Sequence, residues 1–262
     1  MSETNTISVE EDGPILRVRL NRPKQRNALN DALRRELEAV FNSMMERADI
    51  RLIILSGEGA SFCAGADLTT TSYPPVEGDW STRRLRASTW QRLLELIERV
   101  PQVTIASAHG HVIGGGALLA TACDFRLITD DIVFRIPELA LGIPLTWNGI
   151  PQLAREVGLP ATRDWVMTAR KVFADELVAT GWAQRCVPAN ELVEATEKLA
   201  NELMDIPPGP LAMTRAMMSA LSRSHPAMQL GWADADIQQW TFSEEEYRET
   251  ARKYMSALKP KD

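Results

Sequence analysis

Residues Gly110–Asp124 read GHVIGGGALLATACD and directly follow the apolar run Val103–Ala106. That short run predicts a buried strand. The triple glycine 114–116 then predicts a tight turn into a helix, because glycine adopts backbone conformations that other residues avoid. The missing side chains would also let a ligand approach the backbone closely. The first N–H groups of such a helix have no partner inside it, so the turn presents free hydrogen-bond donors.

A second turn of the same kind comes earlier in the chain. Ser61–Leu68 reads SFCAGADL and follows the apolar run Leu52–Leu55, which also predicts a buried strand. One such turn is weak evidence, since glycine is common there for steric reasons alone, but two could together form an oxyanion hole. Neither fits a nucleotide motif, because no G-x-G-x-x-G follows the first strand and no Gly-Lys-Ser or Gly-Lys-Thr occurs.

The flanking sequence predicts an α/β core followed by a helical region. Ile15–Leu20 alternates apolar and arginine residues, typical of a half-buried strand, and Asn30 is a candidate N-cap for a helix with one apolar face. Other expected elements are a helix at 90–97 and strands at 125–128 and 132–136. Beyond Pro144 almost only helices are expected, with a soft boundary near Pro207. Thr69–Arg86 lacks any period and is predicted to be a loop acting as a mobile lid.

Composition narrows the class of protein. The 262 residues are 45% hydrophobic and 24% charged, which predicts a compact globular chain. A formal charge of -6 has the wrong sign for gripping a phosphate backbone, so no nucleic-acid partner is expected. Three cysteines without framework spacing, no secretion signal and no long apolar run predict a cytoplasmic protein without membrane attachment.

Four blocks of sequence read LNRPKQRNALN (20–30), SFCAGADL (61–68), GHVIGGGALLATACD (110–124) and FRIPELALGI (134–143). In this order, and over about residues 8–200, the chain resembles the crotonase, or enoyl-CoA hydratase/isomerase, family. The resemblance implies an α/β fold, a crotonase-type spiral of ββα units in residues 1–200, with a C-terminal helical trimerisation region in 201–262. It also implies an acyl-CoA thioester as partner, no metal or redox cofactor, and a homotrimer or dimer of trimers.

The resemblance also assigns roles to residues. The backbone N–H groups of Ala66 and Gly115 would bind the thioester oxygen, and Glu138 would be the catalytic carboxylate. The hydratase pattern has a second glutamate where this chain has Leu118. One acid favours moving a double bond over adding water, and the alternatives are a one-glutamate hydratase, another lyase or hydrolase of the family, and a non-catalytic binding member. Substrate contacts are expected from Arg26, Ala28, Ala64, Gly65, Asp67, Leu68, Leu118, Leu141 and Trp147.

Plainer interpretations stand beside these roles. Glu138 could be an ordinary surface carboxylate in a salt bridge, and Leu118 a core residue. Cys63 and Cys123 fit small core residues better than nucleophiles. His109 and His111 would share one face of a strand, but without a third ligand they predict packed or pocket-lining imidazoles rather than a metal site.

Trp80 and Trp147 are candidates for shaping the acyl pocket, although core packing is the ordinary role of tryptophan. The tail carries Glu249-Thr250 and Ala257-Leu258 where relatives often have an acid-Gly and a Lys-Arg pair, so its contribution to coenzyme binding is in doubt.

Overall fold

The computed structural model describes residues 5–68, 78–224 and 231–258. Its strands are β1 (Ile7–Asp12), β2 (Ile15–Leu20), β3 (Leu52–Gly57), β4 (Val103–Ala108), β5 (His111–Ile113), β6 (Phe125–Thr129), β7 (Val133–Arg135), β8 (Lys171–Val172) and β9 (Arg185–Val187). Its α-helices are α1 (Asp31–Met44), α2 (Trp80–Ala87), α3 (Thr89–Arg99), α4 (Gly115–Thr121), α5 (Gly149–Thr168), α6 (Ala174–Ala179), α7 (Leu192–Met204), α8 (Pro208–Ser224), α9 (Asp234–Ser243) and α10 (Glu245–Leu258). Three short 3-10 helices are η1 (Pro23–Gln25), η2 (Glu138–Leu141) and η3 (Ala189–Glu191).

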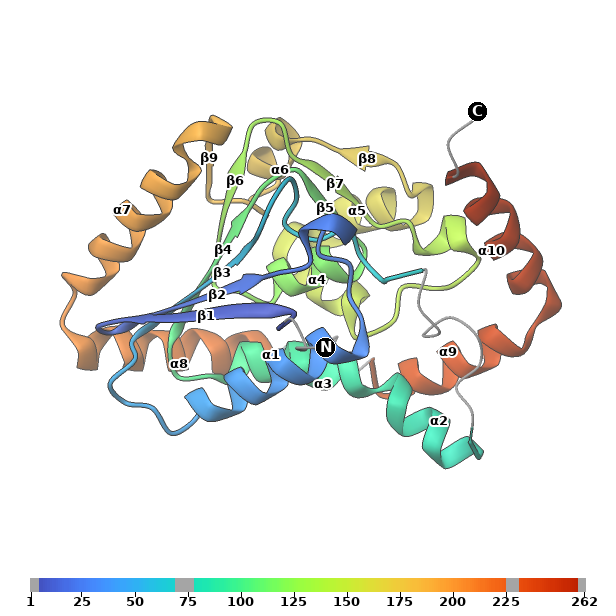
Figure 1. Cartoon of the computed structure of the whole chain (residues 1–262), viewed down its shortest axis with the longest axis horizontal. Helices are drawn as coiled ribbons and strands as arrows, with labels where there is room; N and C mark the ends of the chain where they lie inside the picture. The colour runs from blue at the N-terminus through green and yellow to red at the C-terminus, as the bar shows by residue number, and fades with distance from the viewer. Residues whose placement is uncertain (1–4, 69–77, 225–230, 259–262) are drawn as a thin grey trace.

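Two sheets organise the described chain. The larger has the order β1-β2-β3-β4-β6-β9, and only its β1–β2 pair is antiparallel. The smaller has the order β5-β7-β8. Along the chain, β5 lies between β4 and α4, and β7 lies between β6 and η2 (Figure 1). These two crossings therefore pass from the large sheet through the small one before the next helix. The predicted strand at 15–20 and the predicted helix after Asn30 are confirmed, with Asn30 Oδ1 accepting from the N–H of Leu33 at 2.9 Å.

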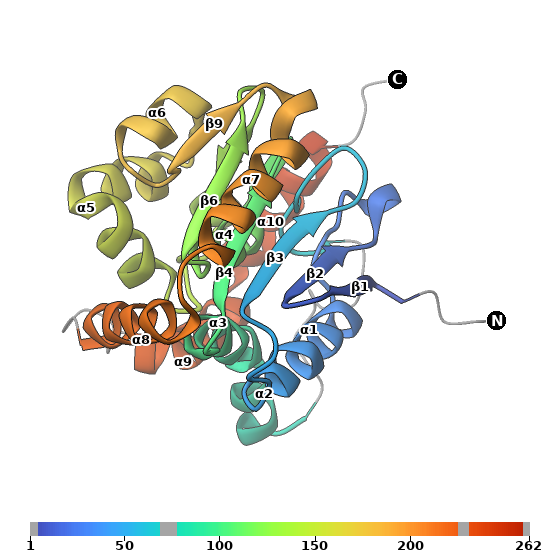
Figure 2. The same ribbon diagram turned by 90° about the vertical axis from the view of Figure 1, so that its left-hand side faces the viewer.

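Helices cover both faces of the large sheet, as Figure 2 shows. Alternate residues of β2 and β3 point to opposite faces, so Leu16 and Ile53 pack with α1 and α3 in the main core. Ile15 and Leu52 pack instead against α7, in a second cluster. Burial on both faces explains why β3 reads as an unbroken apolar run rather than an alternating one.

Three expectations from the sequence need correction. Residues Trp80–Arg86 are not loop, because they lie in α2, whose first turn is capped by Asp79 accepting from the N–H of Thr82 at 2.8 Å. Residues 69–77 of the predicted lid lie outside the described residues. The region beyond Pro144 is not purely helical, since β8 and β9 each join a sheet through only two or three residues, too few to leave a pattern. The sequence reading also missed β1 and α9.

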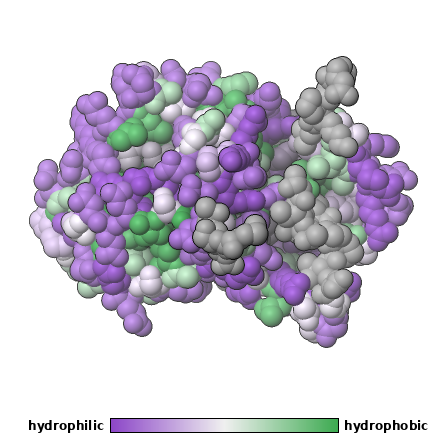
Figure 3. All heavy atoms as spheres, viewed as in Figure 1, coloured by the Kyte–Doolittle hydropathy of each residue, from purple (hydrophilic) through white to green (hydrophobic). Residues whose placement is uncertain are grey.

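The C-terminal helices α8, α9 and α10 lie along the outside of the sheet layers (Figure 1). Polar side chains cover most of the face in Figure 3, and its apolar areas are small and separate. The apolar row on α8 is much more continuous: Met213, Met217 and Leu221 recur every four residues and are 62%, 73% and 74% exposed. The division of the chain at residue 200 stays a prediction. Across the residues described, no helix is long and apolar enough to span a bilayer.

Candidate active site

Each glycine of the triplet 114–116 has a different neighbour where a side chain would stand. A Cβ on Gly114 would lie 2.6 Å from Glu138 Oε1. One on Gly115 would lie 2.4 Å from Cζ3 of Trp147, and one on Gly116 would lie 2.6 Å from Cβ of Cys63. A real Cβ atom essentially never lies closer than 3.0 Å to another such heavy atom. The triplet is therefore needed because three groups from distant parts of the chain close on the start of α4.

The turn at 61–68 is held by the loop that precedes α1. Leu29 donates its N–H to Gly65 O at 2.8 Å and accepts from the N–H of Asp67 at 2.9 Å. Because Leu29 bonds to the residues on both sides of Ala66, the N–H of Ala66 points away from this pairing. Ala64 donates to Arg26 O at 2.9 Å, so predicted contact residues from the two segments are brought together.

The two glycine turns also pack on each other. Cys63 donates its N–H to His111 O at 3.0 Å, and Ile113 returns a bond to Cys63 O at 3.0 Å. A Cβ on Gly65 would lie 2.9 Å from Ile113 O, so the backbones touch. Gly115 is the first residue of α4 and its N–H has no carbonyl to bond within that helix. The segments that carry the N–H groups of Ala66 and Gly115 are thus neighbours.

Glu138 brings a carboxylate to this place. It begins η2, and its Oε2 is buried without a hydrogen-bond partner among the described residues. Burial raises the pKa of Glu138 from 4.5 to about 7, against smaller lowering effects from its own backbone N–H and from Arg135. A carboxylate with a pKa near neutrality accepts a proton more readily than an exposed one and still ionises at physiological pH. Glu138 forms no ion pair with any residue that the structure describes, so a salt bridge does not account for this carboxylate.

Other predicted contact residues hold the turns rather than standing at the glycine triplet. Asp67 accepts from Arg22 Nη2 at 2.8 Å, and the same guanidinium donates to the carbonyl of Ala28. Arg26 takes a left-handed conformation at φ 47° and lies near enough to His111 to help lower the pKa of that imidazole, after burial. These contacts fix the backbone around Ala66.

The predicted apolar contact residues divide between two places. Leu118 is 1% exposed and packs against Gly149 and Leu145. Leu68 and Leu141 belong instead to a cluster with Tyr247 of α10. Beside it, a Cβ on Gly142 would lie 3.1 Å from Thr250 Cβ, so the tail helix packs on η2.

The cysteines and histidines have structural contacts. Burial raises the pKa of Cys63 and of Cys123 to about 12, which disfavours a thiolate in either. Only His111 lies on a strand, with Nδ1 3.1 Å from Ser61 Oγ, while His109 precedes β5 and contacts Gly59 O at 2.8 Å. The two imidazoles therefore have separate partners.

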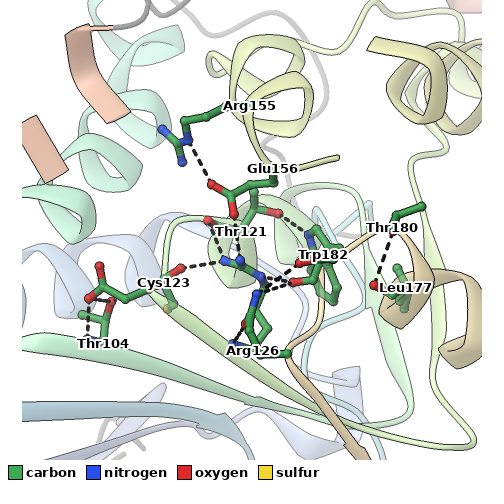
Figure 4. Close-up of polar contacts among 12 residues, drawn as sticks. Thr104, Thr121, Cys123, Arg126, Arg155, Glu156, Leu177, Thr180 and Trp182 are labelled. Carbon is green, nitrogen blue, oxygen red and sulfur yellow. Dashed lines mark hydrogen bonds and ion pairs between the residues drawn. The ribbon is translucent and has the colours of Figure 1, made fainter. Parts of the chain in front are cut away.

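The far end of α4 is clamped by a buried arginine, shown in Figure 4. Arg126 donates to the carbonyls of Cys123 at 2.7 Å and Thr121 at 3.3 Å, and its Nη2 pairs with Glu156 at 2.7 Å. Trp182 adds a bond from its indole N–H to Thr121 Oγ1 at 3.0 Å. A cation at a helix C-terminus satisfies its free carbonyls, so this cluster fixes α4 from behind.

Several of these residues were missed from the sequence. Asn27 is fully buried, and its amide donates to Glu58 O at 2.9 Å and Ser61 O at 2.8 Å, tying the first loop to the glycine turn. Arg22 and Arg126 were equally unnoticed. A surface loop rich in arginine and asparagine carries no signal that distinguishes these buried groups from solvated ones.

Comparisons with known proteins show the family to which the chain belongs. A family model described as enoyl-CoA hydratase/isomerase matches residues 10–261. The mitochondrial Delta(3,5)-Delta(2,4)-dienoyl-CoA isomerase of Homo sapiens is 34% identical, covering 80% of this chain and 67% of the relative. The short-chain-enoyl-CoA hydratase of Clostridium acetobutylicum is 30% identical, covering 79% and 78%.

Solved structures add the fold. A Thermobifida fusca YX protein, solved in complex with CoA, superposes with a TM-score of 0.76 at 27% identity, covering 97% of this chain and 93% of that one. The crotonase-type α/β fold with a helical C-terminal region is thereby confirmed. On the full-length match and these relatives, the chain belongs to the enoyl-CoA hydratase/isomerase family.

Proposed function

We propose that this protein is an acyl-CoA isomerase that shifts a carbon–carbon double bond by proton transfer through an enolate. Glu138 is the base, and the N–H groups of Ala66 and Gly115 hold the thioester oxygen. The observation that carries the proposal is the position of Glu138 Oε1, 2.6 Å from where a Cβ on Gly114 would stand, one residue before the N–H of Gly115. That position sets a base beside a donor of the kind an enolate oxygen needs.

The chemistry follows from these two groups. The Glu138 carboxylate takes a proton from C2 of a 3-enoyl thioester, and the electron pair moves onto the thioester oxygen. The two N–H groups stabilise that negative charge, each by about 3–4 kcal/mol in comparable enzymes. The protonated Glu138 then returns the proton at C4, leaving the double bond at C2. The cycle consumes no water and calls for no metal or redox cofactor.

Leu118 supports isomerisation over hydration. Hydration needs a positioned water, and the residue in the place of a second acid is an apolar side chain packed on Leu145 and Gly149. Hydratase activity with one glutamate is the alternative, since relatives bear both names. A binding member without turnover is the other alternative. The raised pKa of Glu138, with no salt bridge to any residue that the structure describes, counts against it.

The proposal extends to partners and location. The substrate is an acyl-CoA thioester, in keeping with the CoA complex of the Thermobifida fusca relative. The exposed row Met213, Met217 and Leu221 on α8 supports assembly into a homotrimer or a dimer of trimers, because so long an apolar row favours burial. A cytoplasmic location remains the expectation.

A panel of 2-enoyl-CoA and 3-enoyl-CoA thioesters, followed by absorbance and mass, tests the proposal. Isomerisation conserves mass, whereas hydration adds one water. We expect interconversion without mass gain, and its loss in Glu138→Gln with acyl-CoA affinity retained. Leu118→Glu is expected to introduce some water addition. A wild-type protein that hydrates efficiently would contradict the isomerase assignment.

A further inference from the structure

Two tryptophans stack beside the glycine triplet. The ring centroids of Trp90 and Trp147 are 5.2 Å apart with an angle of 15° between the planes. Both side chains are only partly buried, although they pack against the main core. The stack joins α3 to the segment between η2 and α5, far apart in sequence.

The edge of this stack touches the backbone of Gly115. A Cβ on Gly115 would lie 2.4 Å from Cζ3 and 3.1 Å from Cη2 of Trp147. If the N–H of Gly115 binds the thioester oxygen at about 2.9 Å, the acyl group begins beside the same residue that the indole touches. Trp90 covers one face of the Trp147 ring and Gly115 one edge, which leaves the other face for an acyl group to meet.

The indole is held there by a strained backbone. Trp147 and Asn148 are successive non-glycine residues in the left-handed region, with φ of 61° and 60°. Such conformations cost energy and persist where the surroundings enforce them. Asp234, the first residue of α9, accepts from the N–H of Asn148 at 2.7 Å. Trp90 packs on one face of the Trp147 ring, and Asp234 holds the backbone of the next residue, so the indole has little freedom to move.

We propose that the Trp90–Trp147 stack is the wall that selects the acyl group, favouring a flat, conjugated, unbranched segment next to the thioester, and that Asp234 is its positioning residue. This inference rests on the proposed function, because it takes the N–H of Gly115 as the oxygen's donor. A conjugated segment can lie offset against an aromatic ring with favourable electrostatics. A saturated chain, with hydrogens above and below its carbon skeleton, cannot approach an immobile ring as closely.

The test compares two acyl-CoA thioesters of equal length by calorimetry, 2,4-hexadienoyl-CoA and hexanoyl-CoA, with free CoA as reference. Wild-type protein is expected to bind the dienoyl thioester about 5- to 10-fold more tightly, within the range of about 2- to 13-fold that aromatic pairs contribute. In Trp147→Leu the ratio should fall to about 1–2 while CoA affinity stays within about twofold, and Trp147→Phe should lie between. Trp240→Leu is the matched control, because Trp240 is 66% exposed on α9 and should leave the ratio unchanged.

Asp234 has its own conservative pair. Asp234→Asn keeps an oxygen to accept from the N–H of Asn148 and should keep the selectivity, whereas Asp234→Ala should lose most of it without losing CoA. Quenching of tryptophan fluorescence by the dienoyl thioester should be retained in Trp240→Leu and lost in Trp147→Leu. Equal affinity for both thioesters in the wild type, or an unchanged ratio in Trp147→Leu, would refute the selecting role of the Trp90–Trp147 stack and leave the proposed function standing. Failure to bind CoA or either thioester overturns the proposed function as well.

Discussion

Replacing Glu138 by glutamine gives two linked expectations, one for activity and one for stability. The amide preserves shape but cannot take a proton, so turnover should fall by at least about 10²-fold. Because burial raises the pKa of Glu138 to about 7, wild-type kcat/KM should rise with pH through about 7 as the carboxylate forms. A pH profile of isomerisation measures this, and Glu138→Gln should have lost the rising limb.

The stability expectation follows from the same burial. The unfolded chain ionises Glu138 near 4.5 and the folded chain near 7, so the folded state binds more protons between these values and loses stability as pH rises through them. Fully developed, the difference is about 3 kcal/mol, and from about pH 5 to about pH 8 it is about 2–3 kcal/mol. Denaturant unfolding at fixed protein concentration should therefore show Glu138→Gln gaining this much over wild type across that range.

The matched control is Glu46→Gln, since Glu46 is exposed on the surface. That variant should follow the wild-type unfolding free energy at both pH values. A constant difference between Glu138→Gln and wild type from about pH 5 to about pH 8 would show that the carboxyl is not desolvated. Undiminished turnover in Glu138→Gln would remove it from the mechanism, whatever its stability.

Three further expectations follow from the packing. Gly115→Ala places a methyl group 2.4 Å from Trp147, so it should cost about 1–3 kcal/mol of stability and most of the activity. Gly209→Ala, where a Cβ meets nothing within 4 Å, is the control and should change neither. Unfolding titrations and activity assays measure both variants. Arg126→Met leaves the carbonyls at the end of α4 without their donor and Glu156 with Arg155 alone, so it should destabilise by about 3–5 kcal/mol in denaturant unfolding. Arg126→Met combined with Glu156→Leu should recover part of the loss. Light scattering should give about 88 kDa for a trimer, three times 29.2 kDa, or about 175 kDa for a dimer of trimers, and Met217→Glu should lower that mass. A monomer in the wild type would refute both assemblies.

The sequence by itself determined the elements that carry their own periodicity. The alternation in Ile15–Leu20, the cap at Asn30 and the apolar run of β3 each depend on neighbours in the chain, and each became the predicted element. The glycine triplet also predicted that other groups approach the backbone closely there, since three consecutive residues without side chains leave that space open. Short strands such as β8 and β9 depend on a distant partner for every hydrogen bond, and the sequence gives no local sign of them.

Only the tertiary structure decided what approaches those glycines. Glu138, Trp147 and Cys63 reach Gly114, Gly115 and Gly116 from segments before and after the triplet, and no spacing in the chain encodes that convergence. The same holds for charge: Glu138 looks like any surface acid in sequence, and its pKa near 7 exists because folding removes its carboxylate from water and gives it no cation to pair with among the described residues. Desolvation is a property of what surrounds a group in space, so folding alone turns this glutamate from an ordinary acid into a base poised near neutral pH.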